Sequence, residues 1–127
     1  MPRMKLSRLL ALALLLGWAC GARAQAMGQA QWAAQVRSAM PAALCKAGTY
    51  FRECFAQSAQ SCRAAAQGAV DTCLKRYESQ MPPVFGKPED GGRWGQVIAA
   101  CAGTAFETSS RGSKRDTARC NDPKAWR

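Results

Sequence analysis

The fold is decided by residues 45–73, CKAGTYFRECFAQSAQSCRAAAQGAVDTC. This segment holds four of the seven cysteines in the chain, in a stretch that otherwise has the spacing of two helices. Cys54 and Cys62 each lie four residues from Ser58, and Cys45 and Cys73 lie roughly symmetrically outside them. The arrangement predicts a helical hairpin that turns near Ser58. We expect nested disulfides across it, Cys54 with Cys62 and Cys45 with Cys73.

Residues 1–24 have the three parts of a secretory signal peptide. Basic residues come first, an apolar run covers 9–19, and small residues lead to Ala24. The leader predicts export with cleavage after Ala24. The apolar run is about half of the roughly 20 residues that a membrane-spanning helix needs, so we do not expect an integral membrane protein.

Lipidation at Cys20 is the alternative to cleavage after Ala24. Ala19 and Gly21 flank Cys20 as in a lipoprotein signal, but Gly17 stands where such a signal has a leucine-like residue. In either case Cys20 takes no part in disulfides, and six cysteines remain. An even number in an exported chain predicts an oxidised framework. For the third bridge we favour Cys101 with Cys120, which would hold the C-terminal segment.

The mature chain, residues 25–127, is long enough for one small domain. Removal of the four basic residues of the leader lowers the net charge from +10 to +6. The chain carries no nucleic-acid-binding motif, so a basic exported protein indicates a different partner. We expect an envelope or secreted protein, or an anionic envelope surface.

Helical periodicity predicts about four helices, and no run alternates as a strand would. Thr49, Ser58 and Asp90 stand where N-caps are expected. Pro41 ends or kinks the first helix, or opens a short turn, and Pro82 stops the third. The predicted fold class is a small, all-α, disulfide-stapled domain with a helical hairpin at its centre. The apolar stripes lie in segments 32–40, 50–55, 59–81 and 94–105.

The sequence contains no histidine. The commonest general base, the usual activation of a serine or cysteine nucleophile, and most zinc sites are therefore excluded. The cysteines lack the short paired spacing of a thiolate zinc site, and no Cys-x-x-Cys redox pair is present. We expect no cofactor, no metal and no catalytic residue.

A small carboxylate-dependent hydrolase is the alternative from another functional class. It requires two acidic residues in one cleft, about 5 to 10 Å apart. Asp71 and Glu78 lie seven residues apart on the longest predicted helix. That spacing is common on solvated helix faces, and the eight acidic residues of the chain are otherwise scattered.

Two stretches are candidate binding surfaces. Residues 89–95, EDGGRWG, would form a recognition loop that presents Arg93 and Trp94, residue types favoured at interface hot spots. In the simpler interpretation, Asp90 caps a helix and Trp94 packs inward. The other stretch is a basic run that would contact an anionic partner or form a solvated loop: Arg111, Lys114, Arg115 and Arg119.

The function that we predict is that of a non-catalytic, exported protein of the bacterial cell envelope, periplasmic or secreted. It would act by binding another macromolecule, in an accessory, chaperone-like, immunity or inhibitor role. A purely structural envelope component is a further alternative. Tyr50, Phe51 and Phe55 are predicted to be core residues.

Overall fold

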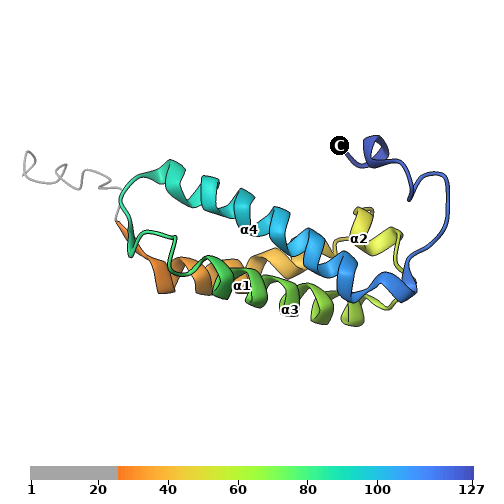
Figure 1. The fold of residues 1–127 in the computed structure, drawn as a ribbon, viewed down its shortest axis with the longest axis horizontal. Helices are drawn as coiled ribbons and strands as arrows, with labels where there is room; N and C mark the ends of the chain where they lie inside the picture. Colours follow the sequence, from red (N-terminus) through yellow and green to blue (C-terminus); the bar gives the residue numbers. More distant parts are fainter. Residues whose placement is uncertain (1–25) are drawn as a thin grey trace, which may run out of the picture.

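The computed structural model describes residues 26–127. The predicted signal peptide, its cleavage after Ala24 and the lipidation alternative at Cys20 lie outside the described residues. Most of the described chain is helical, and the only sheet within it is a pair of two-residue strands. The helices are α1 (Gln29–Leu44), α2 (Tyr50–Glu53), α3 (Ala59–Tyr77) and α4 (Pro88–Ser109), followed by the short 3-10 helices η1 (Arg111–Ser113) and η2 (Pro123–Trp126) (Figure 1).

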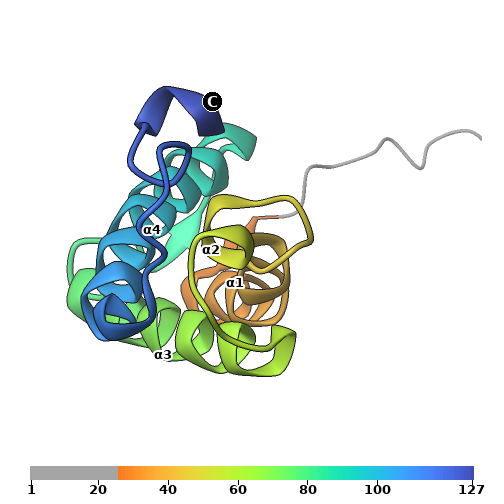
Figure 2. The same cartoon turned by 90° about the vertical axis from the view of Figure 1, so that its right-hand side faces the viewer.

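Helix α3 is the centre of the fold, because it packs along both α1 and α4 while those two contact each other little (Figure 2). Its inward face is made of small and aliphatic residues and two cysteines. A helical hairpin is present, but its arms are α1 and α3, with the single turn of α2 in the connection. The hairpin predicted within residues 45–73, with its turn near Ser58, is not formed. The small, all-α, disulfide-stapled domain is therefore confirmed. The buried residues of α3 are Cys62, Ala66, Ala69, Val70, Cys73 and Leu74.

Helix α1 continues past Pro41 for one more turn, so this proline does not end the helix. The N–H of Cys45 donates to the carbonyl of Pro41 at 3.1 Å and closes the last turn. Gly48 then takes a φ of +86°, the left-handed region that favours glycine, and redirects the chain.

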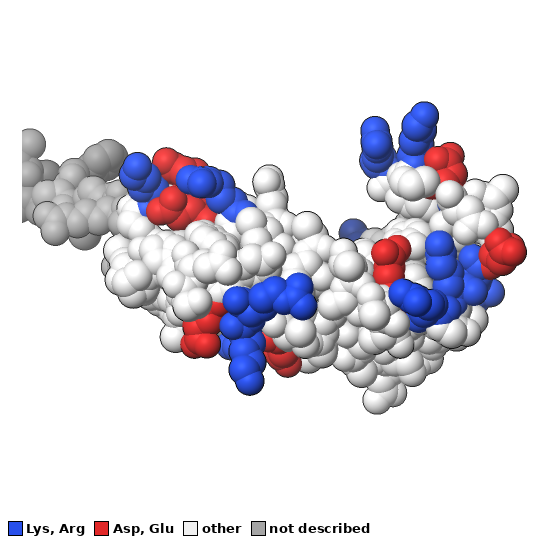
Figure 3. Space-filling model, viewed as in Figure 1, with Lys and Arg blue, Asp and Glu red and all other residues white. Residues whose placement is uncertain are grey.

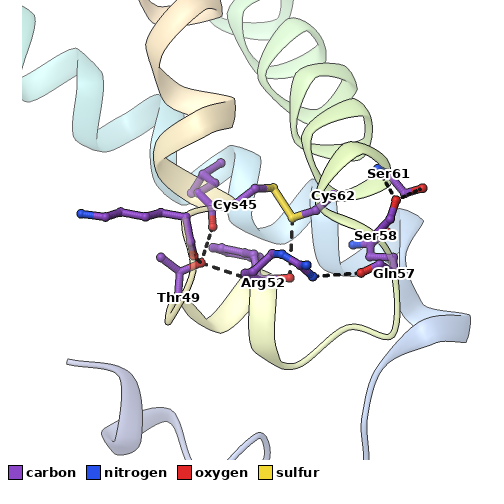
Figure 4. The surroundings of a disulfide bond; sticks show 10 residues. Cys45, Thr49, Arg52, Gln57, Ser58, Ser61 and Cys62 are labelled. Carbon is purple, nitrogen blue, oxygen red and sulfur yellow. Dashed lines mark hydrogen bonds between the residues drawn. A yellow bond between two sulfur atoms is a disulfide. The ribbon is translucent and has the colours of Figure 1, made fainter.

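The N-caps predicted at Thr49 and Ser58 are confirmed. The hydroxyl of Thr49 accepts from the N–H of Arg52 at 3.4 Å, and that of Ser58 accepts from the N–H of Ser61 at 3.0 Å. The guanidinium of Arg52 donates to the carbonyl of Gln57 at 2.9 Å (Figure 4). These bonds fix the short connection that brings the start of α3 beside the end of α1.

The N-cap predicted at Asp90 is wrong, because α4 begins two residues earlier at Pro88. Proline suits the first helical turn, where its missing N–H has no partner to lose. Asp90 lies in that turn and accepts from the N–H of Lys87 at 3.3 Å, and its charge complements the helix dipole. The stretch 89–95 is consequently helix and does not form the recognition loop that was one of its two interpretations.

None of the predicted disulfide pairs is present, although all six cysteines are paired. The first bridge, Cys45–Cys62, joins the end of α1 to the first turn of α3. The second, Cys73–Cys101, joins α3 to α4, and the third, Cys54–Cys120, joins the residue after α2 to the C-terminal segment. The nested pairing required α2 to be a full arm of the hairpin. With one turn of helix, α2 cannot be aligned along α3.

A short antiparallel sheet, β1 (Met27–Gly28) with β2 (Val84–Phe85), was not predicted. Two residues are too few for an alternating pattern. The pairing nevertheless fixes the start of α1, since the N–H of Gln29 also donates to the carbonyl of Pro83 at 2.9 Å. Phe85 then packs its ring 5.0 Å from that of Trp32.

Candidate functional site

The basic run lies at the end of the molecule where α3 begins and α4 ends. Its backbone pairs with the chain after α2: the N–H of Ala56 donates to Ser113, and that of Arg115 donates to Cys54. This pairing holds the run in a fixed position. All four cations predicted as binding residues are exposed: Arg111, Lys114, Arg115 and Arg119.

The C-terminal tail, residues 116–127, folds back over α2 (Figures 1 and 2). The Cys54–Cys120 disulfide holds its middle. Near its end, the indole N–H of Trp126 donates to the carbonyl of Arg119 at 3.0 Å, and the guanidinium of Arg119 lies 4.1 Å from the indole ring centre. Trp126 meets the ring of Tyr50 edge-on at 5.7 Å. The tail is thus a short structured loop.

An aromatic cluster lies beneath this tail. Phe55 and Phe106 are fully buried, with ring centres 5.1 Å apart, which confirms Phe55 as a core residue. Tyr50 and Phe51 belong to the same cluster but are only half-buried. They were predicted to be core, and instead they form the wall of a surface groove.

This groove, of about 500 Å³, runs between the tail, α2 and α4, and we call it the sub-tail groove. Figure 3 shows the molecule hollowed between the C-terminal tail and the helical body. Its floor is a strip of small residues on α4, and its walls are aromatic. The side chains that it offers a ligand are Tyr50, Phe51, Thr104, Glu107, Lys114, Asn121 and Trp126.

A hydrogen bond orders the polar end of the sub-tail groove. The phenol of Tyr50 donates to Oε1 of Glu107 at 2.6 Å. Burial, together with this hydrogen bond and the carboxylate charge, raises the pKa of Tyr50 to about 12. Tyr50 therefore stays a neutral donor at physiological pH, and Oε2 of Glu107 is free to accept from another group. The ammonium of Lys114 lies 5.9 Å from the centre of the Tyr50 ring.

Arg93 and Trp94, the other predicted binding residues, lie near the start of α4, at the opposite end of that helix from the tail. Arg93 is exposed. Trp94 is half-buried and packs against Tyr77, with ring centres 6.2 Å apart. The structure separates these two residues from the basic run, so the two predicted surfaces are not one site.

A second groove, of about 620 Å³ between α1 and α3, contains both Asp71 and Glu78. Both carboxylates are exposed. Asp71 is engaged by the guanidinium of Arg37 at 3.1 Å and by the amide of Gln67 at 3.2 Å. The pairing of Asp71 with Lys75 that helical spacing allows is not formed. Within residues 26–127, no three His, Cys, Asp or Glu side chains are grouped to hold a metal ion.

Sequence reasoning found the cations of the tail end but missed Glu107, Asn121 and Trp126. The available signal was Trp126, a large apolar residue six positions after Cys120 in an otherwise polar tail. A pinned tail that ends in tryptophan predicts that the ring packs back on the domain. No pattern in the sequence indicated which side chains it would meet.

Comparison with known proteins identifies the family. Residues 26–114 match the family described as T2SS substrate NttA, T2SS denoting the type II secretion system. The chain belongs to this family. It is therefore an exported protein, as the leader predicted. No curated protein and no solved structure matches the chain. The matched residues include α1 to α4, whereas Cys120 and Trp126 lie beyond them. Among residues 26–127, no helix is both long and apolar enough to cross a membrane.

Proposed function

We propose that the mature chain is released from the cell and acts there without catalysis, by binding an anionic macromolecule. The observation that carries the proposal is the exposed basic run beside the aromatic sub-tail groove. Residues 111–127 contain six Lys or Arg against two Asp, on one end of the molecule. Concentrated positive charge attracts an anionic partner, and adjacent aromatic rings supply contact area.

The rigidity of this end supports a binding role. Backbone pairing at Ala56 and Arg115 and the Cys54–Cys120 bridge hold the cations in place before any partner arrives. A preformed surface loses less conformational entropy on association than a mobile one, so more of the contact energy remains as affinity.

The hydrolase alternative is less well supported. Asp71 and Glu78 share a groove, but Glu78 follows Asp71 by seven positions, just past the end of α3, and the helix rise separates them by roughly 10 Å. That separation is at or beyond the upper limit for paired glycosidase carboxylates, about 10 Å. Asp71 is also held by Arg37 and Gln67. A purely structural envelope role is less favoured for another reason: the family consists of secretion substrates.

Site-specific photo-crosslinking tests the proposal. A benzophenone amino acid replaces Arg115 in one secreted variant and Arg93 in another; both arginines are exposed, and each replacement removes one positive charge. We expect defined macromolecular adducts from position 115 and none from position 93. Equal adducts from both positions, or adducts from position 93 alone, would contradict the proposed surface.

A charge-matched pair of variants tests the electrostatic part. One variant has alanine at Arg111, Lys114, Arg115 and Arg119, and the other has alanine at four exposed cations elsewhere: Arg63, Lys75, Arg76 and Lys87. Both lose four charges. Only the first should lose binding to the crosslinked partner, and wild-type binding should weaken as salt rises from about 0.1 M toward 1 M. Equal binding by the two variants would exclude a role for this cluster.

A further inference from the structure

The sub-tail groove exists because α4 presents small residues to the tail. Ala100 and Gly103 leave the helix backbone close to the surface. A Cβ on Gly103 would come within 3.2 Å of Cζ of Phe51, so this ring occupies the space that the glycine frees. The tail above is held at a distance by the disulfide and by the edge-on contact of Trp126 with Tyr50. The volume of about 500 Å³ is typical of small-molecule sites.

The polar groups of the groove include both signs of charge. Glu107 and Lys114 both line it, yet they do not pair with each other; the one ion pair within residues 26–127 joins Arg37 and Asp71. Asn121 donates through its amide nitrogen to Asp116 at 2.7 Å, which leaves its amide oxygen to accept. The groove thus offers donors and acceptors side by side.

These groups discriminate among classes of ligand. A wholly apolar ligand would bury Oε2 of Glu107 and the ammonium of Lys114 without hydrogen-bond partners, which is costly. A simple anion would be placed against Glu107, and a simple cation against Lys114. A neutral ring that carries many hydroxyl groups satisfies both, because each hydroxyl donates and accepts. Its C–H face can also pack on aromatic rings, here Phe51 and Trp126.

We propose that the sub-tail groove binds a pyranose ring of a glycan, with Glu107 accepting from one ring hydroxyl and Lys114 donating to another. This inference deepens the proposed function and rests on it: the macromolecule would be a glycan or would carry one. The surrounding cations would then contact acidic groups on neighbouring sugar units.

Saturation-transfer difference NMR on the oxidised mature chain tests the inference. The probes are maltotriose, cellotriose, tri-N-acetylchitotriose and trigalacturonate, at millimolar concentration. We expect saturation transfer to ring C–H protons of at least one probe. A preference for trigalacturonate would support contact of the surrounding cations with acidic groups of the glycan, and a preference for a neutral trisaccharide would support binding of the ring in the groove without that contact. No transfer to any of the four would overturn the inference.

A matched pair of substitutions localises the binding. Ala100→Tyr fills the groove from an exposed position of α4, and Ala64→Tyr places the same side chain at an exposed position of α3. Binding should weaken about tenfold or more in the first variant and stay unchanged in the second. Circular dichroism and thermal unfolding establish that both fold. Equal affinity of the two variants would place the sugar elsewhere and overturn the inference.

A conservative substitution tests the role of the carboxylate. Glu107→Gln keeps the shape of the side chain but removes its charge, so sugar binding should weaken about tenfold. Failure of this inference is distinguishable from failure of the proposed function. Adducts at position 115 without sugar binding would refute only the inference that the groove binds a glycan. Sugar binding without adducts at position 115 would refute the proposed binding of a macromolecular partner.

Discussion

At the scale of single residues, burial and the hydrogen bond to Glu107 set the pKa of Tyr50, one of the two tyrosines of the chain. The pKa of Tyr50 is raised from 10.0 to about 12, by burial and by Glu107. In the variant Tyr77→Phe, the phenolate absorbance should therefore rise near pH 12 and not near pH 10. A raised folded-state pKa means that the stabilisation is present below pH 10 and is lost as pH rises through 12.

The substitution Glu107→Gln in the same Tyr77→Phe background is the control. It removes the carboxylate charge but not the burial, so the pKa of Tyr50 should fall part of the way toward 10. A phenolate transition at pH 10 in both proteins would show that Tyr50 does not donate to Glu107 in solution.

Unlike the Tyr50–Glu107 hydrogen bond, the Arg37–Asp71 ion pair is expected to contribute little to stability. Its two side chains are 49% and 50% exposed, so water screens the attraction. Arg37→Ala and Asp71→Asn should each change the free energy of unfolding by less than about 1 kcal/mol in urea titrations. A loss of several kcal/mol for Asp71→Asn alone would reveal a role that the exposed pair does not explain.

At the scale of elements, two adjacent glycines of α4 differ in their surroundings. A Cβ on Gly92 would meet nothing within 4 Å, whereas a Cβ on Gly91 would lie 3.2 Å from Nε1 of Trp32. Gly92→Ala should stabilise the protein by about 0.4 to 1 kcal/mol, because it reduces the freedom of the unfolded chain. Gly91→Ala should stabilise the protein less than Gly92→Ala does, or destabilise it, since the Trp32 ring must move.

Urea unfolding of the two alanine variants and of Gly95→Ala provides the comparison. Gly95 also has open space around its Cα, so its alanine variant should behave like Gly92→Ala. Gly103 differs from both, because the ring of Phe51 occupies the space beside it. Equal stabilisation by all three variants would show that Trp32 adjusts at no cost.

The sequence predicted elements where the signal is local. Thr49 and Ser58 cap the helices that follow them because a capping hydroxyl acts on a backbone N–H three residues away. The N-cap prediction at Asp90 was wrong for a related reason. An acidic residue is favourable both at the N-cap and in the first turn of a helix, and only Pro88 distinguishes these two positions. The two-residue strands are too short to show the alternation of apolar and polar residues that predicts a strand.

The disulfides and the site depend on the path of the chain, which local patterns do not encode. Cys54 and Cys62 are close in sequence, yet α2 is too short to align them, and Cys54 instead pairs with a cysteine 66 residues away. The groove has the same origin. Glu107, Lys114 and Trp126 come from α4, from the segment after η1 and from the tail, and only the fold brings them together.

At the scale of the whole molecule, each disulfide fixes a different junction. Cys45–Cys62 ties α1 to α3, Cys73–Cys101 ties α3 to α4, and Cys54–Cys120 ties the tail to the domain. Chain-entropy arguments give about 3 to 4 kcal/mol for loops of these lengths. Even one such contribution is a large share of the free energy of unfolding of a small domain, about 5 to 15 kcal/mol, when its core contains many alanines.

Removal of the tail disulfide should separate the fold from the site. In the double variant Cys54→Ala with Cys120→Ala, α1, α3 and α4 keep their own two bridges and their helical circular dichroism. The tail loses its covalent anchor, so hydrogen exchange should rise in residues 116–127 and proteases should cut there. Because the tail forms one side of the sub-tail groove, the affinity of the groove for sugar should also fall.

The double variant Cys73→Ala with Cys101→Ala is the matched comparison. It loses a bridge of the same kind between α3 and α4, where packing already holds the helices together. Its unfolding midpoint should fall, while the tail stays protected in hydrogen exchange and the groove keeps its ligand. A tail that remains protected without Cys120 would mean that Trp126 and Arg119 hold it unaided, and that the groove does not depend on this disulfide.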